Sequence, residues 1–433
     1  MSPSLSLGSA VGPVDPVEGP CAAGRGALAS RRSYALLAAL VTAGLVAVCT
    51  SAAWPATSPI AASSDRAGLD QGWRSLYVGC LVAAFVCYVA GLILLSRGAA
   101  RLKLVAALAL AIQLIPLGGP LLLSTDAWSY WGYARIAAFD GANPYRDPPS
   151  SFPSDPAYSF AGRAWRHTTS VYGPVFTLSS EPIAHAVGAS ADAAAWVYKT
   201  LAALAVLIAA ALAAFLARAK SFALAFVGWN PLLALDFAGG GHNDSWMAAA
   251  VLAALALAAT NRRRLAAVAW ALAIFIKWVP LLLLPLHGLE TRDGKHRLDT
   301  TAFAAAALVI AGLATWRYGL SWSGAFKPLS RAAAHGSHFA LPHRLAGLGL
   351  SKSLAFAIIA AAFATAYGWV ARGAWRGHAR LGLTACLILL AAPYLVSWYT
   401  VWAVPLAAAE EDRAAQVVTL GLCAYLLRQG ITH

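Results

Sequence analysis

Long apolar runs recur along almost the whole chain, and they limit its possible folds more than any other feature. The first three extend over about 33–52, 76–96 and 103–123, close to the roughly 20 residues that a helix needs to cross a bilayer. Only 12% of the 433 residues are charged, about half the share of a soluble domain. Because backbone polar groups in lipid must be satisfied within the chain, we expect an all-α, polytopic transmembrane helical bundle. The runs predict about 11 to 13 helices.

Clusters of Lys and Arg beside these runs predict the orientation, because cytoplasmic loops are enriched in both residues. Arg31 and Arg32 place the N-terminus in the cytoplasm, and the Asn-Arg-Arg-Arg run at 261–264 is the strongest signal of this kind. The net charge of +14 follows from such clusters. No basic face with interleaved aromatic residues accompanies them, so nucleic-acid binding is not expected. The sequence predicts a multi-pass protein of the inner (plasma) membrane.

The N-terminal residues 1–30 are rich in Gly, Pro, Ser and Ala, which predicts a disordered tail before a membrane domain over 31–433. The first apolar run can be a cleaved signal peptide or an uncleaved helix. It is as long as a full span, so we favour the uncleaved helix.

Two apolar runs are interrupted by polar residues near their centres. The run 265–287 contains Lys277 and Pro280, and the run 381–409 contains Ser397, Trp398 and Tyr399. Basic residues on both sides of the first run place both of its ends in the cytoplasm. We therefore expect pairs of half-spans that turn back, and the same parity argument makes 173–187 a re-entrant or interfacial segment. Broken helices of this kind are tolerated where they line a cavity.

The longest polar stretch within the membrane region covers 124–172 and is rich in Pro and aromatic residues. The orientation makes it an external loop with short interfacial helices, and loops of this length are usually functional. Asp126 lies at its start among aromatic residues. A carboxylate there can act as general base toward a sugar hydroxyl, or it can simply cap the helix that follows.

Further polar groups are predicted on the same outer side. Lys277 can bind a lipid phosphate as a point charge, or it can snorkel toward the interface. The Gly-rich turn at 239–244 can present backbone amides to an anion, or it can be only a tight turn. Its His242 and Asp244 are too few ligands to define a metal, although a divalent metal is possible.

Two groups closer to the C-terminus also allow two interpretations each. Arg331 can face a phosphate, or it can belong to a solvated loop. Trp398 and Tyr399 can contact substrate, or they can form an interfacial aromatic belt.

Several ordered motifs together resemble a known family. Asp126 to Arg135, Gly-Ala-Asn-Pro-Tyr at 141–145 and Val-Tyr-Gly-Pro at 171–174 are similar to the first external loop of GT-C-type glycosyltransferases. The bacterial polyprenol-phosphate-mannose-dependent alpha-1,6-mannosyltransferases are the most similar group. Trp-Asn-Pro-Leu at 229–232, the turn at 241–244 and Lys-Trp-Val-Pro at 277–280 also resemble that group.

The resemblance implies a membrane glycosyltransferase that moves a hexose, expected to be mannose, from polyprenyl phosphate to an envelope glycan or glycolipid by inverting displacement. It implies that Asp126 is the catalytic base. Lys277, Arg331 and His242 are the candidates for binding the lipid phosphate. No second carboxylate stands beside Asp126, so no metal or other cofactor is expected. The candidates for substrate binding are Trp128, Tyr130, Tyr133, Arg135, Asn143, Tyr145, Tyr172, Asn243, Asp244, Trp398 and Tyr399.

Two other functions remain open. Broken helices with ionisable residues at membrane depth are a feature of transporters and flippases, although the two halves of this chain show no convincing internal repeat. A non-catalytic subunit of an assembly is the other alternative.

Overall fold

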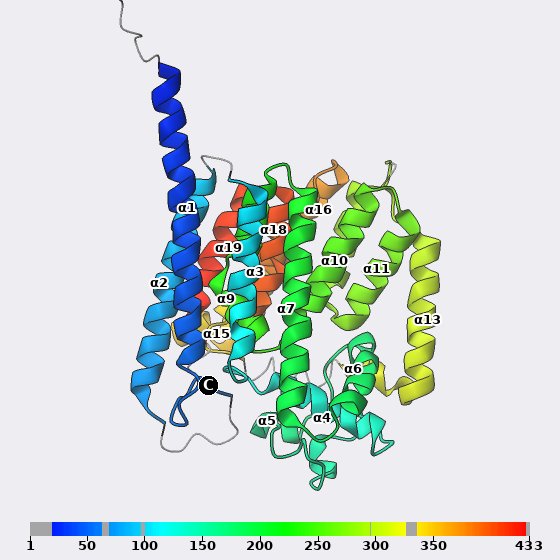
Figure 1. Cartoon of the computed structure of the whole chain (residues 1–433). Coiled ribbons are helices and arrows are strands. Elements are labelled where there is room, and N and C mark those ends of the chain that lie inside the picture. Colours follow the sequence, from blue (N-terminus) through cyan, green and yellow to red (C-terminus); the bar gives the residue numbers. More distant parts are fainter. Residues whose placement is uncertain (1–19, 63–68, 97–99, 295, 326–335, 430–433) are drawn as a thin grey trace, which may run out of the picture.

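The computed structural model describes residues 20–62, 69–96, 100–294, 296–325 and 336–429. Within these ranges the chain is a bundle of helices without β-strands, which confirms the all-α prediction (Figure 1). The N-terminal half contains α1 (Pro20–Ser51), α2 (Gln71–Ser96), α3 (Leu102–Leu114), η1 (Ile115–Gly118), α4 (Asp126–Ala138), η2 (Pro149–Ser151), α5 (Arg163–Arg166), α6 (Pro174–Val187) and α7 (Ala191–Leu216).

The remaining elements alternate long helices with short ones. They are α8 (Lys220–Gly228), α9 (Pro231–Leu233), η3 (Ala234–Gly239), α10 (Asp244–Ala259), α11 (Arg263–Ile276), η4 (Val279–Leu282), α12 (Leu284–Glu290), α13 (Thr300–Tyr318), η5 (Gly319–Ala325), α15 (Leu341–Gly347), α16 (Lys352–Trp375), α17 (Leu381–Ala391), η6 (Ser397–Trp402), α18 (Val404–Glu410) and α19 (Arg413–Leu426).

Among the described residues, five helices are long and apolar enough to cross a membrane, which makes the chain a multi-pass membrane protein. They lie at Ser30–Ser51, Gln71–Ser96, Ala191–Leu216, Thr300–Ala325 and Lys352–Trp375. A sixth span results if Lys220–Gly228 and Pro231–Gly239, which are bent by 44°, are counted as one. Shorter apolar helices complete the bundle.

The predicted tail is partly helical. Helix α1 begins at Pro20, so residues 20–30, which we expected to be disordered, continue the first span beyond its apolar part. Their Ala and Arg residues have high helix propensity, and extending an existing helix costs far less than nucleating one. The rest of the predicted tail, 1–19, lies outside the described residues.

The two interrupted runs do turn back. The Arg263 Nε–H at the start of α11 donates to the Arg297 carbonyl, in the loop after α12, at 2.7 Å. The start of α11 and this loop therefore lie on the same side of the bundle. The second pair behaves alike: the Glu410 carboxylate at the end of α18 accepts the N–H of Leu381 at 2.7 Å, at the start of α17. Lys277 and η6 therefore both lie at the opposite end, as the charge pattern predicted.

The segment expected to be an external loop packs across that same end of the bundle, together with the helix that follows it (Figure 1). It contains α4 and α5 and leads into α6, a helix of 14 residues that lies against α4 and α11. Helix α6 occupies 174–187, the segment predicted to be re-entrant or interfacial, and it is too short for a full span. The loop thus covers the helix ends that carry Lys277 and η6.

Candidate active site

Asp126 is the first residue of α4, and its side chain faces inward with 8% exposure. Thr125 is the N-cap of α4, and its side chain makes no capping hydrogen bond. The alternative that Asp126 merely caps its helix is therefore wrong. The Asp126 Oδ2 atom lies 3.2 Å from the Nδ1 atom of His242, within ion-pair distance. The Nδ1 atom makes no aligned hydrogen bond, so the carboxylate keeps its lone pairs available.

Backbone contacts bring Asp126 and His242 together although they are far apart in the sequence. The N–H of Leu122, just before α4, donates to the Gly239 carbonyl at 3.0 Å. Gly241 has a φ of +73°, which favours glycine, and a Cβ there would lie 3.3 Å from the Cβ of Ala127. The Gly-rich turn is therefore needed to let His242 approach the start of α4.

Aromatic rings of η6 form one wall of the site. The Trp398 ring stacks on the His242 imidazole with centroids 3.8 Å apart and 10° between the planes. Tyr399 stacks on Trp402 at 4.1 Å. Trp398 and Tyr399 thus lie against buried polar groups, which is not the arrangement of an aromatic belt at the lipid interface.

Lys277 reaches the same wall and forms an ion pair there. Its Nζ atom lies 2.6 Å from Asp244 Oδ1, which also accepts the Trp402 indole N–H at 2.6 Å. The ammonium lies 4.8 Å from the centre of the Tyr399 ring, a cation–π distance. Lys277 therefore points into the site and does not snorkel. Asp244 Oδ2 is buried without a hydrogen-bond partner in the described part of the chain.

Tyr130, Tyr172 and Asn243 line the site between these groups. The Tyr130 hydroxyl accepts the N–H of Asn243 at 3.4 Å, and its ring packs edge-on against Tyr172 at 4.8 Å. Burial, followed by the charge of Asp126, raises the pKa of Tyr172 well above its usual value. The Tyr172 hydroxyl therefore stays protonated. The side-chain amide of Asn243 is buried, and neither of its polar atoms has a hydrogen-bond partner among the described residues.

Other predicted substrate residues hold the loop together instead. The Arg135 guanidinium pairs with Asp155 at 2.9 Å and donates to the Gly188 carbonyl at 2.7 Å. The Asn143 amide donates to the Tyr318 carbonyl at 2.6 Å. Because these groups are satisfied within the protein, their placement does not support direct substrate contacts.

Three more predicted residues bond to backbone carbonyls within the described chain. They are Trp128, bonded to Ala191 at 3.0 Å, Tyr133, bonded to Thr168 at 2.7 Å, and Tyr145, bonded to Tyr172 at 2.9 Å. A donor that is already paired with a buried carbonyl is costly to withdraw. These side chains therefore shape the loop, and Tyr145 also fixes the backbone of Tyr172.

Two buried ionisable residues were missed by the sequence reasoning. Asp236 in η3 is 4% exposed, and its Oδ1 atom accepts the Ser397 hydroxyl at 3.0 Å. The Lys199 ammonium in α7 donates to the carbonyls of Leu117, Gly119 and Pro120. These three residues lie in the segment that leads to Asp126. A charge inside an apolar run is a functional candidate, so the sequence did contain a signal for both.

Arg331 lies outside the described residues. In the part of the chain that is described, no group of three or more His, Cys, Asp and Glu side chains is arranged to hold a metal ion.

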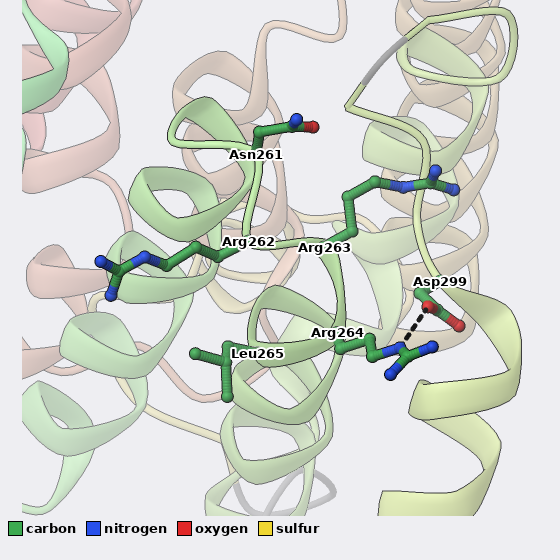
Figure 2. Close-up of a pocket in the computed structure, with 6 residues that line it drawn as sticks. All are labelled: Asn261, Arg262, Arg263, Arg264, Leu265 and Asp299. Atoms are coloured by element: carbon green, nitrogen blue, oxygen red, sulfur yellow. Dashed lines mark ion pairs between the residues drawn. The ribbon is translucent and has the colours of Figure 1, made fainter.

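A hollow of about 520 Å³ lies at the other end of α10, between the start of α11 and the start of α13 (Figure 2). It is lined by Asn261, Arg262, Arg263, Arg264, Leu265 and Asp299. Helix α10 has 16 residues, so this end is about 24 Å from Asp244. Figure 2 shows Arg262 pointing away from Arg263 and Arg264, and Asp299 lies 4.0 Å from Arg264. The hollow is thus a basic feature of the predicted cytoplasmic side and is separate from the site.

Gly173 fixes the position of α6 beneath Lys277. Its N–H donates to the Ile276 carbonyl at 3.1 Å, and a Cβ there would collide with the Phe275 carbonyl and lie 2.7 Å from that of Ile276. We expect Gly173→Ala to displace the backbone next to Lys277 and to lower the rate constant of the reaction about 100-fold, as small misplacements do. Overpacking should also lower the free energy of unfolding by about 1–3 kcal/mol.

Thermal unfolding in detergent and turnover assays check this prediction. The matched control is Gly44→Ala, because nothing lies within 4 Å of a Cβ at that position. A Gly173→Ala protein as active and as stable as the control would show that the close approach is not required.

The fold and the site define a class: a multi-pass membrane protein that gathers a carboxylate, an imidazole and a lysine under a loop at one end of its helices. The chain belongs to the alpha-(1->6)-mannopyranosyltransferase family, whose N-terminal domain matches residues 33–291. The resemblance noted in the sequence is thereby confirmed.

One relative shows the extent of the likeness. The chain is similar to alpha-(1->6)-mannopyranosyltransferase A of Corynebacterium glutamicum, with 26% identity over 226 residues that cover 46% of each protein. The match thus spans about half the length of that relative. No solved structure matches the chain.

Proposed function

We propose that this protein is an alpha-mannosyltransferase that moves mannose from polyprenyl phosphate to an envelope glycan or glycolipid. The reaction would take place at the non-cytoplasmic side of the plasma membrane. The observation that carries the proposal is that the Asp126 carboxylate faces the His242 imidazole at 3.2 Å, in the site that also contains Lys277. Family membership supports the sugar and the linkage.

The proposed chemistry is a single displacement. The Asp126 carboxylate accepts the proton of the acceptor hydroxyl while that oxygen attacks the anomeric carbon. The bond from this carbon to the phosphate oxygen breaks, and the phosphate leaves with one more negative charge. Because the attack comes from the opposite face, an alpha product requires a beta-linked donor.

The growing charge on the leaving phosphate explains the cations. Lys277 and His242 lie on the turn and helix ends that surround Asp126, where a charge that develops in the transition state can be stabilised. The Asp244 carboxylate holds the Lys277 ammonium in place. We propose that the donor phosphate replaces this carboxylate as the partner of the ammonium. Arg331 remains a further proposed contact. No metal is required in this scheme, because protein cations do the work of charge stabilisation.

A transporter or flippase is the second candidate, favoured by the two helix pairs that turn back on themselves, α11–α12 and α17–α18. A transporter or flippase would move a lipid-linked or small polar substrate, whereas only the enzyme forms a glycosidic bond. The enzyme would therefore yield a new glycoside, whereas a transporter would move its substrate across the bilayer unchanged.

Reconstitution into liposomes with synthetic beta-mannosyl polyprenyl phosphate and a mannoside that has a free 6-hydroxyl separates them. We expect a new alpha-1,6 linkage by mass spectrometry and NMR, no product from GDP-mannose, and unchanged rates in EDTA. Movement of the lipid-linked sugar across the bilayer without a new bond would favour the transporter. Strict dependence on GDP-mannose would overturn the proposed donor.

A further inference from the structure

The side-chain amide of Asn243 is buried in the site without a partner. The residue is 1% exposed, and neither its Oδ1 nor its Nδ2 atom has a hydrogen-bond partner among the described residues. Almost all buried polar groups of folded proteins are hydrogen-bonded, because burying an unpaired one costs free energy. An amide that is unpaired at both polar atoms therefore needs a partner from outside the described chain.

The amide does not serve its own helix. Asn243 is the N-cap of α10, where an asparagine side chain normally accepts an N–H of the first turn, but it makes no such bond. Instead, the backbone carbonyl of Asn243 accepts the Trp246 N–H at 3.1 Å, and its N–H donates to the Tyr130 hydroxyl at 3.4 Å. Asn230, the fully buried N-cap of α9, differs because its Oδ1 atom accepts the Leu232 N–H at 3.0 Å. Helix capping thus accounts for the Asn230 side chain but not for that of Asn243.

The two chain neighbours of Asn243 contact the two groups between which the sugar would react. The His242 imidazole faces Asp126 at 3.2 Å, and the Asp244 carboxylate holds Lys277 at 2.6 Å. In the proposed displacement the anomeric carbon lies between the base and the cation that receives the phosphate. Adjacent Cα atoms are about 3.8 Å apart, so Asn243 is close to both groups. The 2-hydroxyl, on the carbon next to the anomeric carbon, is the sugar hydroxyl nearest to the reacting bonds.

We infer that the Asn243 side chain binds the 2-hydroxyl of the transferred mannose and selects this sugar. The inference rests on the proposed function. An amide can accept the hydroxyl proton at Oδ1 and donate to an oxygen from Nδ2, so it matches a hydroxyl in both of its roles. In glycoside hydrolysis, hydrogen bonds to this hydroxyl strengthen in the transition state. Mannose and glucose differ only in the configuration at this carbon, so a contact there discriminates between them.

Asn243→Leu tests the inference, because leucine has nearly the same shape but no polar atom. In liposomes, turnover of beta-mannosyl polyprenyl phosphate is compared with turnover of its 2-deoxy analogue. We expect kcat/KM for the mannosyl donor to fall about 10- to 100-fold. For the 2-deoxy donor kcat/KM should stay unchanged or rise, because that donor leaves the wild-type amide unpaired. The unfolding temperature should not fall, since leucine removes a buried group that has no partner in the protein.

Asn230→Leu is the matched control. It removes an amide that is bonded within the protein, so it should lower the unfolding temperature. The ratio of kcat/KM for the two donors should stay at the wild-type value. If Asn243→Leu does not fold, Asn243→Ala removes the same polar atoms with less volume and is read in the same way.

An Asn243→Leu protein that loses the same factor with both donors would overturn the inference and would mean that buried water satisfies the amide. A changed donor ratio in Asn230→Leu would overturn it as well. Failure of the proposed function looks different, because the wild-type protein would then transfer no sugar from either donor, and the inference would fall with it.

Discussion

Replacing Asp126 by asparagine is expected to lower the rate of sugar transfer about 1,000-fold, the contribution typical of a general base. The amide has the same shape but cannot accept the proton of the acceptor hydroxyl. The protein should still insert and fold, because Asp126 does not cap α4 and makes no aligned hydrogen bond with His242. Turnover with beta-mannosyl polyprenyl phosphate and unfolding temperature, measured on the same preparation, check both parts.

Asp140→Asn is the matched control for this experiment. Asp140 follows α4 in the same loop but is exposed, so the same change of charge there should leave the rate within about twofold, as surface substitutions usually do. If Asp126→Asn kept more than a tenth of the wild-type rate, Asp126 would not be the base.

Replacing Lys277 by methionine is expected to lower both the rate of sugar transfer and the free energy of unfolding. The substitution leaves the Asp244 carboxylate, 1% exposed, as an uncompensated buried charge, which costs about 3–5 kcal/mol. The loss of the ammonium should lower kcat by a further 100- to 1,000-fold, about the effect of removing one transition-state donor. Denaturation in detergent and single-turnover rates measure the two effects separately.

The double variant Lys277→Met with Asp244→Asn separates charge burial from catalysis. It removes both charges, so most of the lost free energy of unfolding should be regained. The rate of sugar transfer should stay as low as in the single variant. Lys103→Met, at an exposed position, is the control for the substitution itself. A double variant with wild-type turnover would mean that Lys277 is a structural partner of Asp244 only.

The sequence by itself determined the helical membrane bundle and its broken pairs. Backbone groups in lipid have no water to bind, so apolar runs of this length become helices. Lys277 and Ser397 interrupt two of those runs, and the positions of the flanking basic residues required the chain to turn back there. The same reasoning brought Asp126, His242 and Lys277 to one end of the bundle.

Only the tertiary structure decided which of these polar groups meet. The partner of Lys277 is Asp244, 33 positions away, and the partner of Asp236 is Ser397, 161 positions away. Arg135 and Asn143 looked like substrate contacts in the sequence, but Asp155 and Tyr318 occupy their donors. A buried polar group must find a partner, but residue type fixes only that need. The packing of helices distant in the chain supplies the partner.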